Sequence, residues 1–225
     1  MDRPFVYINM AMTADGKITS ASREYPTFTS AHDKKTMDRL RAEADAVLVG
    51  AGTLRADDPP LGVRDREMRE YRRSLGKPED LARVAVTSSL DLDPGLRFFR
   101  EGAGTRIVAT VEDAPEERAS PLAEVAEVWR VGRGRVDLPG LLTKLRARGV
   151  ERLLVEGGGE LNWEIVEQDL LDELYVTIAP FLLGGRNAPT LLEGEGLAMS
   201  GPVRLRLAAA DRHGDELYCR FEVVR

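Results

Sequence analysis

Three adjacent glycines, residues 157–159, lie between an apolar run at residues 153–156 and a segment with helical spacing at residues 160–167. A junction between a strand and a helix points backbone N–H groups and the positive end of the helix dipole at an anion. Glycine lets the backbone come close to a phosphate, and a tight turn alone would need one glycine rather than three. The pattern therefore favours a phosphate site. It fits neither the GxGxxG fingerprint, because Asn162 stands at the third glycine position, nor the P-loop, because no Gly-Lys-Ser/Thr follows.

A second glycine segment, residues 50–53, follows another apolar run at residues 46–49. Thr53 and Asp57 come at close spacing after it. Their side chains could hydrogen-bond a ribose or an amide, or they could simply cap turns, and the residues alone leave both readings open. Two glycine segments after two strands of one sheet predict a dinucleotide laid across the strand ends, the usual ligand position in open α/β sheets.

Two arginines stand out in an acidic chain. Arg41 closes a helical segment just before residues 46–49, and Arg64 closes a loop that begins at Asp57 and contains two prolines. A guanidinium can grip a phosphate with two parallel hydrogen bonds, which suits an anionic substrate. A lone arginine is more often a solvated surface charge, so composition does not decide between these roles.

Other kinds of site are disfavoured by the residue counts. One cysteine, Cys219, and two histidines, His32 and His213, cannot form an internal disulfide or a cysteine-rich zinc site, so no metal is expected. Both histidines are predicted to be exposed, and Cys219 is predicted to pack in the core. No GxSxG nucleophile elbow is present.

Composition places the chain among ordinary globular proteins. Its 225 residues are 43% hydrophobic and carry a formal net charge of −6, which is a poor match to nucleic acid. No apolar run approaches the roughly 20 residues of a membrane span, and the N-terminus lacks the basic-then-apolar layout of a signal peptide. We therefore expect a cytosolic protein with no nucleic-acid or membrane partner.

The predicted elements alternate between strand and helix and then become consecutive strands. Ser30, with Asp33 three residues later, predicts the start of a helix. Residues 57–64 are predicted to be a loop because of their prolines, and residues 65–80 to be charged and mostly solvated, with a surface helix as one option. This order predicts one α/β domain over residues 1–225, with a mostly parallel sheet flanked by helices and antiparallel C-terminal strands. Strands are predicted at residues 5–12, 46–49, 84–87, 107–110, 124–130, 153–156, 174–183, 203–211 and 216–224, and further helices at residues 138–148 and 160–167.

Four stretches match one family in order: residues 10–19 (MAMTADGKIT), 40–64 (LRAEADAVLVGAGTLRADDPPLGVR), 155–161 (VEGGGEL) and 180–189 (PFLLGGRNAP). They resemble the pyrimidine reductases of riboflavin biosynthesis, which occur alone or as the C-terminal half of a bifunctional deaminase–reductase. The resemblance covers nearly the whole chain and implies a dihydrofolate-reductase-like fold, NADPH as cofactor and a homodimer. It also implies reduction of the ribosyl group of 5-amino-6-(5-phosphoribosylamino)uracil, or of its 2,5-diamino-pyrimidinone relative, to a ribityl group. Two histidines and one cysteine cannot supply the deaminase's zinc signature, so no deaminase domain is expected.

The resemblance also assigns parts to individual residues. Glu156, Asp15 and Lys17 are implied as catalytic. Residue 27 is Thr where relatives often carry a large aromatic residue, and residues 65–80 form a longer segment than in the bifunctional enzymes. Contacts to the substrate are implied for Asn9, Arg41, Leu61, Arg64 and Glu156, with the arginines near its 5′-phosphate. Contacts to NADPH are implied for Tyr25, Thr27, Thr53, Asp57, Ser88, Gly157, Gly158, Gly159, Glu160, Leu161 and Asn162, in a turn that runs on to Glu164.

Hydride transfer is the cofactor's own reaction, so the protein must chiefly orient two bound molecules. We hypothesise that the ribose opens to an imine at C1′, that this carbon receives the hydride, and that Glu156, or a water held by Asp15 or Lys17, moves the proton. Three alternatives stay open. The chain could be a reductase of a folate or pterin, a non-catalytic NADPH-binding protein, or an α/β protein with ordinary tight turns, which explains three adjacent glycines poorly.

Overall fold

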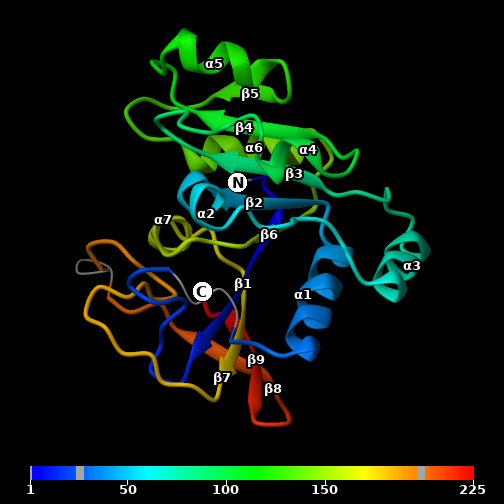
Figure 1. The fold of residues 1–225 in the computed structure, drawn as a ribbon, viewed down its shortest axis with the longest axis vertical. Helices are drawn as coiled ribbons and strands as arrows, with labels where there is room; N and C mark the ends of the chain where they lie inside the picture. The colour runs from blue at the N-terminus through cyan, green and yellow to red at the C-terminus, as the bar shows by residue number, and fades with distance from the viewer. Residues whose placement is uncertain (1, 24–27, 197–200) are drawn as a thin grey trace. The chain divides into compact units, whose positions relative to one another are not determined.

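The computed structural model describes residues 2–23, 28–196 and 201–225, and the chain divides into two compact units (Figure 1). The first unit contains Met1–Phe5 and Asp38–Leu154, and the second contains Val6–Met37 and Val155–Arg225. Each unit has its own set of neighbouring strands, described separately below. The single domain predicted for residues 1–225 stays a prediction.

The first unit is built on parallel strands in the order β5-β4-β3-β2-β6. The pairs β2–β3, β3–β4 and β4–β5 are parallel, and the middle residues of β2 and β3 are fully buried, as expected for strands covered on both faces. Figure 1 shows α5 beside β5 at the top of the ribbon. The strands are β2 (Ala46–Gly50), β3 (Ala82–Val86), β4 (Arg106–Thr110), β5 (Glu127–Arg130) and β6 (Arg152–Val155), and the helices are α2 (Ala51–Asp57), α3 (Arg66–Ser74), α4 (Arg97–Arg100), α5 (Glu116–Ala123) and α6 (Leu138–Ala147).

The second unit has the strand order β1-β7-β9-β8. β1 (Phe5–Thr13) pairs with β7 (Glu173–Ala179) in parallel, whereas β9 (Glu216–Val223) is antiparallel to both β7 and β8 (Leu205–His213). Gly214, with φ +61°, makes the turn between β8 and β9. Helix α7 (Gly159–Glu167) belongs to this unit, and α1 (Ala31–Glu43) begins in it and ends in the first unit.

The predicted mostly parallel sheet with antiparallel C-terminal strands is confirmed. Every predicted strand is present, with shifted ends. The largest shift is in β7, which was predicted to run to residue 183 but ends at Ala179. Pro180 follows Ala179 and has no N–H to donate to the ladder, which explains the early end.

Helix α2 is a correction to the sequence analysis. Residues 50–53 were predicted to be a turn and residue 57 to open a loop, but Ala51–Asp57 is helical. A helix of seven residues has too few apolar positions to show a helical period, and only Ala51 and Leu54 are buried in it. The short helices α4 and α5 were missed for the same reason.

The charged segment at residues 65–80 is mostly exposed, as its composition predicts, but one of its arginines is buried. Helix α3 is present, and its N-cap Asp65 accepts a hydrogen bond from the backbone N of Met68 at 3.0 Å. Most of its side chains are exposed, as predicted, but Arg72 is only 1% exposed. A charge run therefore contains one of the most deeply buried residues of the protein.

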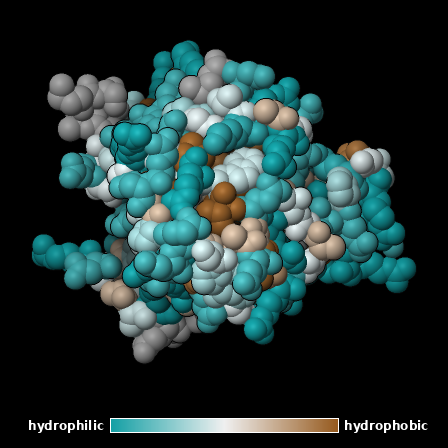
Figure 2. All heavy atoms as spheres, turned by 90° about the horizontal axis from the view of Figure 1, so that it is seen from above, coloured by the Kyte–Doolittle hydropathy of each residue, from teal (hydrophilic) through white to brown (hydrophobic). Residues whose placement is uncertain are grey.

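The surface is mostly hydrophilic on the face seen in Figure 2, with a small group of hydrophobic side chains near its centre. Cys219 is buried, as predicted. Within the described residues, no helix has the length and apolar character needed to cross a membrane.

Candidate functional site

The glycine turn of the second unit opens directly into α7. Its N-cap is Gly158, which has no side chain that could cap the first turn. The backbone N–H groups of a first helical turn have no partner within the helix, and they attract anions. This geometry is suited to a phosphate, as the sequence pattern suggests.

Two of the three glycines also have a packing reason. Gly157 has φ +82°, and a Cβ there would lie 2.7 Å from the Cε atom of Met10. A Cβ on Gly159 would lie 2.6 Å from the Cγ atom of Glu193 and 2.8 Å from the carbonyl oxygen of Thr190. The number of glycines is therefore a weaker argument for ligand binding, because the positive φ favours glycine at 157 and the contact with the Thr190 carbonyl favours it at 159.

Asn162, on the first turns of α7, is fully buried. Its Nδ2 atom donates to the carbonyl of Leu191 at 3.0 Å, which fixes the orientation of the amide, but its Oδ1 atom accepts no hydrogen bond within the described part of the chain. A buried acceptor without a donor is costly, so a ligand that donates to it would bind favourably. Together with the uncapped turn, this orphan oxygen means that the residues fit a nucleotide cofactor.

Asp15 and Lys17, predicted to be catalytic, both hold the loop that follows β7. The Asp15 carboxylate accepts hydrogen bonds from the Thr13 hydroxyl at 2.6 Å and from the backbone N atoms of Gly184 at 2.6 Å and Leu183 at 3.1 Å. These three hydrogen bonds hold the pKa of Asp15 at about 2, so it is ionised near neutral pH. Lys17 donates from Nζ to the carbonyl of Ala188 at 3.0 Å.

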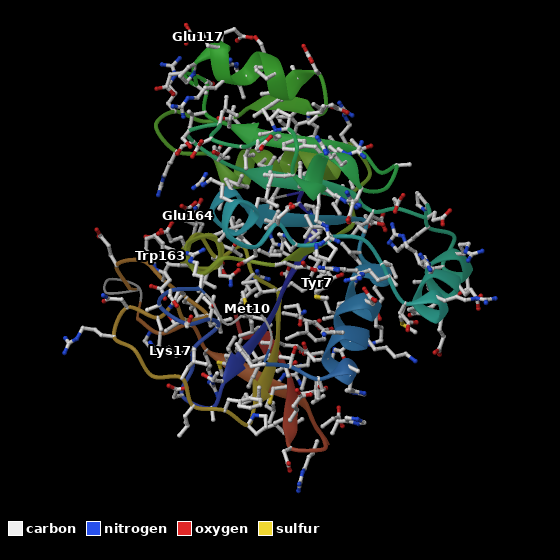
Figure 3. The ribbon with its side chains drawn as sticks, in the orientation of Figure 1. Tyr7, Met10, Lys17, Glu117, Trp163 and Glu164 are labelled. Carbon is white, nitrogen blue, oxygen red and sulfur yellow. The ribbon has the colours of Figure 1, made fainter. Side chains whose placement is uncertain are left out.

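Among the other predicted residues of the second unit, Asn9 and Glu156 are half-buried, Glu160 is exposed and Leu161 is buried. Asn9 lies on β1 opposite Tyr175 of β7, and Glu156 lies between β6 and the glycine turn. Figure 3 shows Met10 on β1 and Lys17 beyond the end of that strand, with Trp163 on α7. Tyr25 and Thr27 lie outside the described residues.

In the first unit, α2 brings two predicted cofactor residues together. Thr53 and Asp57 are four residues apart on this helix and therefore share one face. Thr53 is half-buried and Asp57 is exposed. The turn after β3 presents Ser88: Thr87 accepts a hydrogen bond from the backbone N of Leu90 at 3.0 Å, and Ser88 is left exposed at the tip.

The predicted substrate residues of the first unit differ in exposure. Arg41 and Leu61 are each 1% exposed, whereas Arg64 is exposed and makes no hydrogen bond or ion pair with the described part of the chain. The Arg41 guanidinium donates to the carbonyl of Gly62 at 3.1 Å and lies 3.9 Å from the Asp38 carboxylate. Arg41 thus holds the loop through the carbonyl of Gly62, while the side chain of Arg64 is exposed to solvent.

One polar cluster of the second unit was not predicted. Ser30 caps α1 as expected, accepting from the backbone N atoms of His32 at 3.1 Å and Asp33 at 3.3 Å, but its hydroxyl also donates to the buried Glu216 at 2.5 Å. Burial alone would raise the pKa of Glu216, yet hydrogen bonds from Ser30 and Tyr218 keep that pKa below its ordinary value. Burial raises the pKa of Asp33. No local pattern pairs residues 186 positions apart, so sequence analysis had no signal for this contact.

The two histidines also meet in this cluster. The rings of His32 and His213 are exposed, as predicted, and stack with centroids 3.8 Å apart and an interplanar angle of 10°. Within the residues that the structure describes, no group of three or more His, Cys, Asp or Glu side chains is placed to hold a metal ion.

A largely parallel sheet, a glycine turn at the start of a helix and a buried orphan acceptor are features typical of α/β enzymes that bind nucleotides. The chain belongs to the RibD C-terminal domain family, whose family model matches residues 4–218. The resemblance seen in the four sequence stretches is therefore confirmed.

Individual relatives agree with this assignment. The chain is 42% identical to the 2,5-diamino-6-ribosylamino-4(3H)-pyrimidinone 5′-phosphate reductase of Archaeoglobus fulgidus, over 86% of this chain and 88% of that protein. Its fold is similar to that of a pyrimidine reductase-like protein from Corynebacterium diphtheriae, with a TM-score of 0.84 and 23% identity over 99% of this chain and 92% of the other. Dihydrofolate reductase from Enterococcus faecalis aligns with a TM-score of 0.51 and 13% identity over 98% of this chain and 97% of the other. The predicted dihydrofolate-reductase-like fold is therefore confirmed.

Proposed function

We propose that the protein is an NADPH-dependent reductase of riboflavin biosynthesis, which converts the ribosyl group of 2,5-diamino-6-ribosylamino-4(3H)-pyrimidinone 5′-phosphate to a ribityl group. The observation that carries this proposal is the 42% identity, over 86% of the chain, to a reductase named for that substrate. Of the two pyrimidine forms left open by the sequence, this relative favours the diamino form over 5-amino-6-(5-phosphoribosylamino)uracil.

The cofactor is proposed to bind at the first turn of α7. The N-cap of this turn is a glycine, which has no side chain to cap it, and the buried Oδ1 atom of Asn162 accepts no hydrogen bond from the described residues. Bound NADPH supplies a hydride. We propose that the turn from Gly157 to Asn162 binds and orients the cofactor. For Thr53, Asp57 and Ser88 of the first unit, cofactor contact remains a proposal that rests on the family resemblance alone.

The substrate phosphate is proposed to bind Arg64. Its guanidinium is exposed and has no partner in the described part of the chain, whereas Arg41 is buried beneath the same loop and donates to Gly62. A planar guanidinium is well suited to a phosphate because it offers two parallel N–H groups. Leu61, a buried residue three positions before Arg64, is proposed as a further substrate contact. Asn9 on β1 is proposed as another.

Glu156 is the residue proposed to move the proton. Asp15 is less suited to that part, because its carboxylate is already engaged by hydrogen bonds from Thr13, Leu183 and Gly184. Its three hydrogen bonds support a positioning role for Asp15 in the loop after β7. Lys17, bound to the Ala188 carbonyl, lies in the same loop region and is proposed to orient substrate or water through its ammonium group.

One assay tests the reaction. The purified protein is mixed with NADPH and the diamino-pyrimidinone ribosyl phosphate, and the loss of reduced-nicotinamide absorbance is followed, with the uracil form and dihydrofolate in parallel reactions. We expect oxidation that depends on a ribosyl phosphate substrate. Oxidation with dihydrofolate alone would support the folate or pterin alternative, and NADPH binding without turnover on any substrate would support the non-catalytic one.

We also propose a homodimer formed through the second unit. β8 is the outer strand of the order β1-β7-β9-β8, and it carries Leu207 at 54% exposure, while Leu217 on β9 is 38% exposed. An exposed edge strand with apolar side chains favours pairing with another chain. Light scattering on the parent and on Leu207→Lys tests this: we expect a dimer that dissociates in the variant, and a monomeric parent would contradict it.

A further inference from the structure

Helix α3 buries one arginine within a segment that is otherwise mostly exposed. Arg72 is 1% exposed, and its guanidinium donates from Nε to the carbonyl of Pro78 at 2.6 Å. Its NH1 atom donates to the carbonyls of Arg41 at 3.2 Å, Ala42 at 3.1 Å and Ala44. A buried cation is tolerated only when it has such hydrogen-bond partners, so these carbonyls fix the position of the Arg72 guanidinium.

Two of the carbonyls that Arg72 contacts, those of Arg41 and Ala42, belong to the last turn of α1, and that of Ala44 directly follows the helix. This helix ends at Glu43, and the last four carbonyls of a helix have no partner within it. The same end carries the negative pole of the helix dipole, which favours a nearby positive charge. Arg72 therefore acts as the C-terminal cap of α1.

The last turns of α1 in turn hold the loop that presents Arg64. Asp38 accepts a hydrogen bond from the backbone N of Asp65 at 2.8 Å, one residue after Arg64. Arg41 donates to the carbonyl of Gly62 at 3.1 Å. The loop is thus tied to α1 on both sides of its exposed arginine, through two side chains less than a turn apart.

We propose that Arg72 is a positioning residue for the phosphate-binding loop at residues 61–65. It fixes the end of α1, and Asp38 and Arg41 transmit that position to the loop, so that Arg64 is held where it can bind the substrate phosphate. This inference rests on the proposed function of Arg64. It gives the charged segment at residues 65–80 a part in substrate recognition, although Arg72 itself touches no ligand.

Three variants test the proposal. Arg72→Met removes the hydrogen bonds, Arg72→Lys keeps the charge but loses the planar fork, and Arg73→Met changes the exposed neighbour on the same helix as a matched control. The first measurement is the ratio of kcat/KM for the phosphorylated substrate to that for its dephosphorylated form. The second is the affinity for ribose 5-phosphate by calorimetry, which needs no turnover.

We expect the kcat/KM ratio and the ribose 5-phosphate affinity to fall at least about tenfold in Arg72→Met, the equivalent of one weakened charge-assisted hydrogen bond. Arg72→Lys should show a smaller loss, the KM for NADPH should stay within about twofold, and Arg73→Met should match the parent. A purely structural role would lower the amount of folded enzyme and leave the ratio unchanged.

Folded Arg72 variants with the parent's ratio and affinity would overturn the proposal. If Arg72→Met does not fold, the same two measurements on Arg72→Lys and Asp38→Asn test the proposal, because both variants keep side chains of similar size at these sites. A parent that binds ribose 5-phosphate but oxidises no NADPH would defeat the proposed function alone, and an affinity loss in the variants would still support the positioning role. A parent with no affinity for ribose 5-phosphate would overturn the phosphate-binding role of Arg64 and with it the positioning role of Arg72, whereas the oxidation assay alone decides the proposed function.

Discussion

The carboxylate of Asp15 accepts a hydrogen bond from the backbone N–H of Gly184 at 2.6 Å, although the two residues are 169 positions apart. Lys17 adds a second tie to the same region by donating to the carbonyl of Ala188 at 3.0 Å. The first and fourth of the recognised sequence stretches are therefore one structural feature of the second unit. Asp15 serves this feature as an ionised acceptor.

The first prediction concerns Asp15→Asn and pH. Because the folded pKa of Asp15 is about 2, below its ordinary 3.8, its ionised form stabilises the fold above about pH 4, and this contribution is lost as the pH falls through about 2. The parent should therefore melt at a higher temperature than Asp15→Asn at neutral pH, with a gap that narrows on acidification. Melting curves across this range check it, and a gap independent of pH would contradict it.

The second prediction concerns Glu156→Gln. If Glu156 moves the proton, the amide keeps the shape of the side chain but cannot exchange a proton, and kcat should fall by roughly a hundredfold or more. The dissociation constant for NADPH, measured by fluorescence titration, should stay close to that of the parent. Turnover equal to the parent's, with unchanged binding, would remove Glu156 from any proton role.

The third prediction concerns Gly159→Ala. The new Cβ would lie 2.8 Å from the carbonyl oxygen of Thr190 and 2.6 Å from the Cγ of Glu193, so the first turn of α7 must shift. We expect a loss of about 1–3 kcal/mol in the free energy of unfolding, as for other overpacked sites, together with weaker NADPH binding. Urea denaturation and calorimetry measure the two effects.

Gly52→Ala is the matched control for that variant. A Cβ at Gly52 meets nothing within 4 Å, and its backbone is helical within α2, so this substitution should be neutral or stabilising by up to about 1 kcal/mol. Equal stability losses in the two variants would show that the close contacts at Gly159 have no energetic consequence.

The fourth prediction concerns Ser30→Ala. The change removes the N-cap of α1 and one donor to the buried Glu216, so the free energy of unfolding should fall by about 1–2 kcal/mol. Ser74→Ala, which removes an exposed hydroxyl bound to the carbonyl of Tyr71, should change it by less than about 0.5 kcal/mol. Urea denaturation of both variants checks the difference, and similar values would mean that the Ser30–Glu216 contact contributes nothing.

The fifth prediction concerns Arg64→Ala. If the exposed guanidinium binds the substrate phosphate, its removal should raise the KM for the phosphorylated substrate by about tenfold or more and leave the KM for NADPH unchanged. Because Arg64 is exposed, the melting temperature should not change. Steady-state kinetics with each substrate varied in turn is the measurement, and an unchanged KM would exclude Arg64 from the phosphate site.

Most of the elements could be predicted because their signals are local. The apolar runs of β1 to β4 and the capping residue Ser30 are short-range patterns, and each led to the right element. α2 was predicted wrongly because a seven-residue helix that begins with Ala51 and Gly52 has too few apolar side chains to show a helical period. The four family stretches predicted which residues form the candidate site. They did not predict which contacts those residues make.

Sequence alone determined the order of the strands, the family, and the glycine turn that opens α7, because turn chemistry and periodicity act between near neighbours. Only the tertiary structure decided that Arg72 lies buried against the end of α1, that Asp15 holds the loop at Gly184, and that Arg64 is exposed while Arg41 is covered. The physical reason is that a hydrogen bond between distant residues depends on where the whole chain brings them. A charged residue has the same sequence signal whether it is solvated or serves as a buried cap.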